Sequence, residues 1–173
     1  MLDSLQTAPL RIQKLSPRHN RKGFDCGVEP LNEYIQAYAR QNERLGISVT
    51  RVAVRGDSPE ILGFYSLSSG HVTCGELPEQ EARRLPNYPI PVVRMGRLAT
   101  SLAARGTGVG AHLLIDALRI SLGVSKDIGI YAIEVDAKST QAREFYRHYG
   151  FAPLSDHPLH MYLTMKTVQA LFG

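Results

Sequence analysis

The sequence is poor in cysteine and lacks the residue patterns of covalent or metal-dependent catalysis. Its 173 residues include two cysteines, Cys26 and Cys74, which are too few for a disulfide-stapled fold. Neither is followed by a second cysteine pair or a nearby histidine at zinc-site spacing, so we expect two reduced thiols and no metal. No Ser-His-Asp pattern or Gly-x-Ser-x-Gly elbow is visible either, which argues against a covalent acyl-enzyme.

Long hydrophobic runs are also missing. No apolar stretch reaches membrane-spanning length, and the first residues, 1–4, carry an early acid in place of the apolar core of a signal peptide. These absences predict a cytoplasmic protein that does not contact a membrane. With 43% hydrophobic residues and no internal repeat, residues 1–173 are expected to form one globular domain.

Positive charge is in excess, and its distribution is uneven. The formal net charge is +4, which favours contact with polyanions, although simple enzymes can be equally basic. One concentration lies within residues 11–22, and a second comprises Arg83, Arg84, Arg94 and Arg97. Each cluster is either solvated surface or a phosphate-binding surface, and the second alternative predicts a steep salt dependence.

The hydrophobic periodicity predicts alternating strands and helices, and hence an α/β (α+β) fold with helices on both faces of a mixed sheet. The helix that begins at Pro30 and stops at Gly46 places Tyr34, Tyr38 and Leu45 on a core-facing side. The apolar period of the helix 111–122 places His112, Asp116 and Arg119 on its solvent-facing side. Residues 74–91 hold four prolines and are expected to be a long irregular excursion without regular helix or inner strand. The expected strands are 10–15, 49–54, 61–68, 92–99, 130–135 and 160–165, and the other expected helices are 111–122, 139–150 and a short one ending near 172.

A glycine-rich loop, 105–110, separates the strand 92–99 from the helix 111–122. Three of its residues are glycine, which leaves backbone N–H groups unobstructed at the start of a helix. A helix N-terminus of this kind carries partial positive charge and binds phosphate groups. The alternative is a flexible turn that merely starts the helix, but glycine is only modestly favoured at that position.

Three families of phosphate-binding loop compete for this stretch. A P-loop is excluded because Ala111 and His112 stand where Lys-Ser/Thr is required. The dinucleotide fingerprint fits loosely through Gly106, Gly108 and Ala111, yet its first glycine should follow the strand directly. The third pattern, [Gln/Arg]-x-x-Gly-x-[Gly/Ala], is met by Arg105, Gly108 and Gly110 and resembles the pyrophosphate loop of the GNAT family of N-acetyltransferases.

The resemblance to the GNAT family extends over most of the chain. Residues 97–99 resemble the central strand of that family, and residues 144–151 resemble its FYxxxGF segment. The resemblance implies a mostly antiparallel GNAT sheet, splayed where acetyl-CoA binds, with the pantetheine arm lying along residues 93–100. The residues that it assigns to acetyl-CoA are Leu98, Ala99, Thr100, Arg105, Gly106, Thr107, Gly108, Val109, Gly110, Ala111 and Ser139.

The resemblance also implies a catalytic residue. Tyr146 matches the tyrosine whose hydroxyl lies near the thioester sulfur in many members, and a protonated phenol can donate to the departing thiolate. The alternative is a core aromatic residue, the role expected of Phe145 and Tyr149. Ser139 stands where many members carry an asparagine that helps to hold CoA, so that contact is reduced to a single hydroxyl.

The whole chain further resembles the acetyltransferase toxins of bacterial type II toxin–antitoxin modules. The matching pieces are residues 24–27 with Leu31 and Asn32, and residues 63–67, 89–91, 96–99 and 144–146. This resemblance implies transfer of acetyl to the α-amino group of aminoacyl-tRNA, which blocks translation. It also implies a ribbon-helix-helix antitoxin, contact with DNA only through that antitoxin, and often a homodimer.

An α-amine of this kind titrates at roughly 7.7–8.0, so a neutral nucleophile is available without a strong base. The use of a general base is left open. The residues expected to grip tRNA phosphates are Arg18, Arg21, Lys22, Arg83, Arg84, Arg94 and Arg97. Two alternatives stay open: a GNAT enzyme acting on a protein N-terminus or small amine, and a non-catalytic nucleotide- or RNA-binding module.

Overall fold

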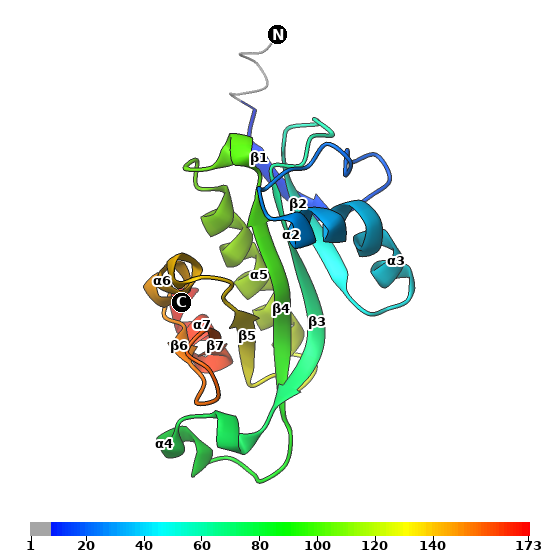
Figure 1. Ribbon diagram of the computed structural model, residues 1–173. Coiled ribbons are helices and arrows are strands. Elements are labelled where there is room, and N and C mark those ends of the chain that lie inside the picture. The colour runs from blue at the N-terminus through cyan, green and yellow to red at the C-terminus, as the bar shows by residue number, and fades with distance from the viewer. Residues whose placement is uncertain (1–7) are drawn as a thin grey trace. The chain divides into compact units, whose positions relative to one another are not determined.

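The computed structural model describes residues 8–173 (Figure 1), so the prediction on residues 1–4 lies outside the described part. The chain divides into two compact units. The first contains the described residues up to Leu67 together with Arg97–Ala117, and the second contains Ser68–Gly96 and Leu118–Gly173.

Seven strands form the sheet, and they hydrogen-bond in the order β1-β2-β3-β4-β5-β7-β6. The β1–β2, β2–β3, β5–β7 and β6–β7 pairs are antiparallel, whereas β4 and β5 are parallel. The predicted mixed, mostly antiparallel sheet is therefore confirmed. The strands are β1 (Leu10–Lys14), β2 (Val49–Arg55), β3 (Gly63–Val72), β4 (Ile90–Thr100), β5 (Ala132–Asp136), β6 (Ala152–Pro153) and β7 (His160–Thr164).

In sequence the helices lie between the strands, except for α7, which follows the last strand. A π-helical turn, η1 (Tyr34–Tyr38), joins α2 (Glu29–Glu33) to α3 (Ala39–Arg44). The others are the 3-10 turns η2 (Cys74–Glu76) and η3 (Leu102–Ala104), and the helices α4 (Glu79–Ala82), α5 (Val109–Ser125), α6 (Thr140–His148) and α7 (Met165–Leu171). Across residues 8–173, no helix has the length and apolar character needed to cross a membrane.

In the first unit, one face of the sheet packs against the segment from α2 to α3. Val52 and Val54 of β2 and Phe64 of β3 are fully buried in one cluster with Tyr34 and Ile35. The Tyr34 and Phe64 rings stack with their centroids 6.0 Å apart. Alternation along the strands sends these side chains to one face and leaves the intervening residues for the other face.

The other face of the same strands holds α5 through a half-buried ion pair. Arg51 of β2 and Tyr65 of β3 both contact Asp116, with distances of 2.9 Å from Arg51 Nε and 2.5 Å from the Tyr65 hydroxyl to Asp116 Oδ2. The first unit therefore has helices on both faces of its sheet, as predicted. The helical period had placed Asp116 on a solvent-facing side with His112 and Arg119. That assignment is wrong for Asp116, because its partners come from strands that the period of one helix cannot reveal.

The π-helical turn changes which side of its helix is buried. Ala39 N–H bonds to the carbonyl of Tyr34, five residues back, so the wider turn shifts the helical register. Ala39 is fully buried, whereas Tyr38 is 47% exposed and Leu45 is 64% exposed. The prediction of a buried face holds for Tyr34 and fails for Tyr38 and Leu45, since it assumed a regular helix.

The proline-rich excursion is shorter and more regular than expected. It contains η2 and α4, and β4 begins at Ile90 and includes Pro91 although β4 is an inner strand. Pro91 is tolerated near the start of that strand because only its carbonyl is needed, and it accepts the N–H of Tyr131.

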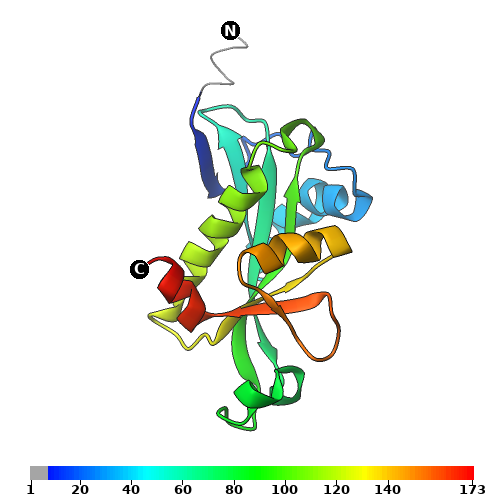
Figure 2. The same cartoon turned by 90° about the vertical axis from the view of Figure 1, so that its left-hand side faces the viewer.

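In the second unit, β5 lies between its two neighbours. Val92–Met95 of β4 pair in parallel with Ala132–Val135, and β7 pairs with β5 on its other side. Ile90, Val92 and Tyr162 belong to a buried cluster at the base of these strands. Figure 2 shows α7 following directly from β7, and the Thr164 hydroxyl caps that helix by accepting the N–H of Thr167.

A tight loop in the first unit explains the motif formed by residues 24–27 and Asn32. The Asn32 side chain accepts the N–H of Cys26 at 2.9 Å and donates to Asp25 Oδ1 at 3.0 Å. The same Asp25 oxygen accepts the N–H of Gly27, whose φ of 80° suits glycine. The hydrogen bonds from Gly27 and Asn32 hold the pKa of Asp25 below its usual value. Buried Asn32 thus fixes the loop to α2.

The substitution Asn32→Ala should lower the free energy of unfolding by about 1–3 kcal/mol, since it leaves the Cys26 N–H without its acceptor. Urea unfolding followed by circular dichroism measures this change. Gln41→Ala, at an exposed position in α3 without a side-chain hydrogen bond, is the control and should stay within about 0.5 kcal/mol of wild type. Equal effects of the two substitutions would contradict the role of Asn32.

Candidate functional site

The N-terminus of α5 presents free backbone donors in the first unit. The first hydrogen bond of this helix runs from His112 N–H to the Gly108 carbonyl, at 3.2 Å. The N–H groups of Val109, Gly110 and Ala111 therefore have no acceptor within the helix. Such donors and the helix dipole together favour an anionic ligand.

The loop before α5 has the conformation and the open space that a pyrophosphate requires. Gly106 and Gly108 have φ of 76° and 84°, values that other residues rarely adopt. A Cβ atom on either glycine would meet no atom within 4 Å, so the space beside the backbone is open. Thr107 closes the turn through its hydroxyl, which donates to the Ala104 carbonyl at 2.5 Å. The loop residues fit a pyrophosphate group.

Two predicted acetyl-CoA residues of this loop have side chains committed elsewhere. Val109 is 1% exposed, so only its backbone is available to a ligand. Arg105 donates from Nη2 to the Cys26 carbonyl at 3.0 Å, which ties the loop of residues 24–27 to the glycine loop. The contribution of Arg105 to a phosphate site is therefore expected from its backbone.

The end of β4 precedes this loop. Ala99 is buried, and Leu98 and Thr100 are half-buried. The parallel register with β5 covers Val92–Met95 and ends there, while β4 runs on to Thr100. The expectation that backbone from Val93 onward is available to a pantetheine arm is thus wrong for Val93–Met95, whose backbone already pairs with β5. Residues 98–100 lie outside that register.

Tyr146 lies in α6 of the second unit and is 6% exposed. Its ring centroid lies 5.3 Å from that of Phe145 and 5.4 Å from that of Phe151. Within the described residues its hydroxyl has no hydrogen-bond partner, and burial raises its pKa. The phenol therefore stays protonated at neutral pH. Phe145 and Tyr149, predicted to be core residues, are only half-buried. Tyr146 is the one residue of α6 that is buried.

Ser139 caps the same helix. Its hydroxyl accepts the N–H of Ala142 at 3.1 Å, which is the standard N-cap bond. A helix over residues 139–150 was expected, and α6 begins at Thr140 with Ser139 as its N-cap. The Ser139 hydroxyl keeps its own proton to donate to a ligand, so the prediction of a CoA contact stays a prediction.

The seven basic residues predicted to bind tRNA lie in both units. Arg18, Arg21, Lys22 and Arg97 belong to the first unit, and Arg83, Arg84 and Arg94 belong to the second. Arg21 and Arg97 are half-buried and the other five are exposed. Arg83 pairs with Glu79 at 2.7 Å and Arg94 with Glu134 at 2.5 Å, so part of their charge is already compensated.

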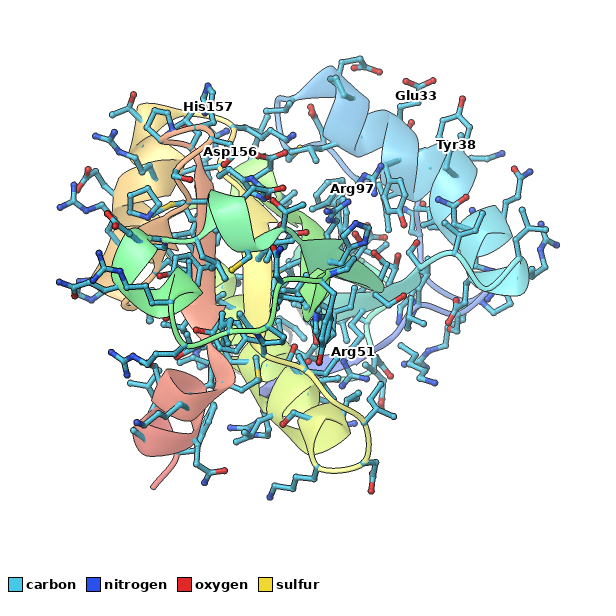
Figure 3. The ribbon with its side chains drawn as sticks, turned by 90° about the horizontal axis from the view of Figure 1, so that it is seen from below. Glu33, Tyr38, Arg51, Arg97, Asp156 and His157 are labelled. Atoms are coloured by element: carbon cyan, nitrogen blue, oxygen red, sulfur yellow. The ribbon has the colours of Figure 1, made fainter. Side chains whose placement is uncertain are left out.

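Sequence reasoning missed a row of charged side chains in the second unit. Glu134 of β5 is 1% exposed, and its two oxygens contact Arg94 Nε and His160 Nε2, each at 2.5 Å. The other ring nitrogen of His160 lies 2.9 Å from Asp156, which Figure 3 labels with His157 in the loop before β7. The sequence did contain a signal for these ion pairs, namely one acidic residue in the otherwise apolar strand 130–135. A carboxylate buried in a strand requires partners.

Carboxylates on both ring nitrogens decide the charge of His160. Burial lowers its pKa, but hydrogen bonds to Asp156 and Glu134, together with their negative charges, outweigh burial and raise the pKa above 6.5. Glu76, Asp156 and His160 offer ligand atoms within 4.8 Å of one another. A histidine protonated on both nitrogens has no lone pair for a metal ion, so this group does not fit a metal site in that state.

Comparisons with known proteins agree with this geometry. The model of the acetyltransferase (GNAT) family matches residues 20–151. A tRNA-acetylating toxin of Mycobacterium tuberculosis is 36% identical to this chain, over 96% of it and 97% of the toxin. AtaT complexed with acetyl-methionyl-tRNAfMet is 28% identical, with a TM-score of 0.88 and coverage of 95% of this chain and 100% of the other. A tyrosine-to-phenylalanine mutant of the toxin AtaT, bound to the C-terminus of the antitoxin AtaR and acetyl-CoA, is 27% identical, with a TM-score of 0.80 and coverage of 94% and 98%.

The raised pKa of His160 predicts how stability depends on pH. Below the ordinary pKa of 6.5 the histidine is protonated in both the folded and unfolded states, and its ion pairs contribute fully. As pH rises from there through the raised pKa of the folded state, this contribution is lost and the free energy of unfolding falls. Urea unfolding between pH 5 and pH 9, roughly the range over which histidine titrates, measures the effect.

The variant His160→Gln should lack this loss of stability at alkaline pH. His148→Gln, at an exposed position with no carboxylate partner among the described residues, should retain it. An unchanged pH dependence in His160→Gln would show that the ion pairs of His160 do not cause the loss of stability at alkaline pH.

Proposed function

The chain belongs to the acetyltransferase (GNAT) family, and from this we propose that it transfers acetyl from acetyl-CoA to the α-amino group of aminoacyl-tRNA. As the toxin of a type II toxin–antitoxin module, it blocks translation because an acetylated α-amine cannot form a peptide bond. The observation that carries the proposal is the similarity to a tRNA-acetylating toxin over nearly the whole length of both chains.

The chain's own residues supply an anchor for acetyl-CoA. When bound, acetyl-CoA provides a thioester as the acetyl donor. The free N–H groups at the start of α5 bind its pyrophosphate, and the left-handed Gly106 and Gly108 hold those groups in place. The remaining proposed contacts are the backbone of residues 98–100 and of Arg105, Thr107 and Val109–Ala111, and the hydroxyl of Ser139.

The acceptor amine requires little activation. An α-amine titrates at roughly 7.7–8.0, and an ester on the same carbon lowers that value, so a neutral fraction exists at neutral pH. Tyr146 then acts as the acid that hydrogen-bonds to the departing thiolate. Its raised pKa suits a group that must remain protonated until the thiolate forms.

We further propose that Arg18, Arg21, Lys22, Arg83, Arg84, Arg94 and Arg97 attract the phosphates of tRNA. An antitoxin partner, indirect contact with DNA through it, a cytoplasmic location and a single functional domain over residues 1–173 are parts of the same proposal. The crystallised relatives support the antitoxin, since one is bound to the C-terminus of AtaR. The homodimer stays a prediction.

The proposal is tested by incubating the protein with radiolabelled acetyl-CoA and a pool of charged tRNAs. Deacylated tRNA from the same pool is the control. Label should appear only on charged tRNA, because the acceptor is the aminoacyl amine. Absence of label on tRNA, with acetyl-CoA still bound, would contradict the proposal and favour a protein N-terminus or small amine as acceptor.

The substitution Tyr146→Phe should leave acetyl-CoA affinity unchanged and lower the transfer rate by about 100-fold or more, since it removes the acid but keeps the ring. Isothermal titration measures the affinity and the labelled-acetyl assay measures the rate. Tyr149→Phe in the same helix is the matched control and should transfer normally. A normal rate in Tyr146→Phe would remove this residue from the mechanism.

The substitution Gly108→Asp should abolish measurable acetyl-CoA binding. It forces a non-glycine residue to φ near 84° and brings a negative charge to the donors that face the pyrophosphate. Gly129→Asp adds the same charge at an exposed glycine whose Cβ would also meet no atom within 4 Å, and it should bind normally. Wild-type affinity in Gly108→Asp would mean that the phosphate site lies elsewhere.

A further inference from the structure

Arg97 is a half-buried cation whose charge no other described residue compensates. Within residues 8–173 its guanidinium makes no ion pair and no hydrogen bond. Its one close contact is an aromatic ring, because the guanidinium carbon lies 3.7 Å from the centroid of Tyr34. A half-buried cation without a counter-ion gains from an anionic ligand, so this arrangement suits the binding of an anion.

The Tyr34 ring is a rigid support for this guanidinium. The ring is 2% exposed, stacks on Phe64, and has its hydroxyl fixed by Ser48 at 2.7 Å. It also stands at the first position of the π-helical turn, and such turns are frequent at functional sites. A guanidinium held on a ring face keeps its planar edge of N–H donors available to a ligand.

Four other arginines with side-chain contacts differ from Arg97 in this respect. Arg94 and Arg83 have carboxylate partners, and Arg105 donates to a backbone carbonyl. Arg119 lies over the ring of Phe172 at 5.7 Å, but on an exposed helix face. Arg97 alone among these five arginines combines partial burial, a fixed ring support and free donors.

We propose that the guanidinium of Arg97 binds a phosphodiester at the 3′ end of the acceptor RNA and thereby positions the aminoacyl amine for transfer. This inference rests on the proposed function. Arg97 immediately precedes residues 98–100, the part of β4 proposed to hold the acetyl arm. The last phosphodiesters of an aminoacyl-tRNA lie within a nucleotide or two of the amine, so a cation at this point of the strand meets them.

The chemistry favours phosphate over other anions. An arginine fork matches phosphate oxygens in a bidentate manner, and single-stranded RNA ends are recognised by stacked arginine planes together with phosphate contacts. The phosphates of CoA itself share this chemistry. The two sources are distinguished by measuring the KM for each substrate separately.

The experiment measures the KM for charged tRNA and for acetyl-CoA, with kcat, for wild type and Arg97→Gln. The variant should raise the KM for charged tRNA by about 10-fold to 100-fold, because a hydrogen-bonded charge contact is lost. The KM for acetyl-CoA should not change, and the kcat at saturating charged tRNA should fall, because the amine is no longer held in position for transfer. The slope of log KM against log salt concentration should fall by about 0.7 to 0.9, the value of one phosphate contact.

Three further variants separate positioning from folding. Arg97→Lys keeps the charge but loses the planar fork, so it should restore the salt slope and recover affinity only in part. Tyr34→Phe keeps the ring under the guanidinium and should retain the wild-type KM even if the loss of its hydroxyl lowers the melting temperature. Arg119→Gln removes one exposed arginine over a ring and should match wild type in both KM values.

The outcomes are distinct. A rise in the KM for acetyl-CoA alone would assign the guanidinium to CoA and overturn the inference. A lowered melting temperature in Arg97→Gln with both KM values unchanged would overturn it too, since Arg97 would then serve only to cover Tyr34. In either case the label found on charged tRNA keeps the proposed function intact, whereas wild-type protein that labels no charged tRNA overturns both.

Discussion

The proposed chemistry depends on a helix that is fixed in position while its first backbone N–H groups have no acceptor within the helix. The N-terminus of α5 meets both conditions within the first unit. Leu113, Leu114 and Ala117 are fully buried, and Asp116 is held to two strands by Arg51 and Tyr65. The left-handed glycines before the helix then turn the chain without placing a side chain over the donors. An anion can bind there without reorganisation of the backbone.

Buried charge is handled in two ways in this protein. Glu134 is buried and Asp116 is half-buried, and each carboxylate has close partners. Those groups hold elements together, as the loss of one partner would leave an isolated charge. Arg97 has a ring beneath it but no anionic partner among residues 8–173, and this difference separates a structural charge from one available to a ligand.

The parts of the site that depend on local backbone chemistry could be predicted from the sequence. Glycines before an amphipathic helix specify a free N-terminus whatever surrounds them, and Ser139 caps α6 as its residue type suggests. The errors arise where distant strands or an irregular helix decide which side chains are buried. Asp116 looked solvated because its partners are 51 and 65 residues away in sequence. Tyr38 looked buried because nothing in the spacing of apolar residues reveals a π-helical turn.

The proposed function depends on transfer of the acetyl group to the amine of an aminoacyl-tRNA. The most direct measurement is mass spectrometry of the aminoacyl-nucleoside released by nuclease digestion after incubation of charged tRNA with acetyl-CoA and the protein. We predict an aminoacyl-adenosine heavier by one acetyl group, with the group on its α-nitrogen. An aminoacyl-adenosine of unchanged mass, while the same preparation acetylates a peptide or small amine, would contradict it.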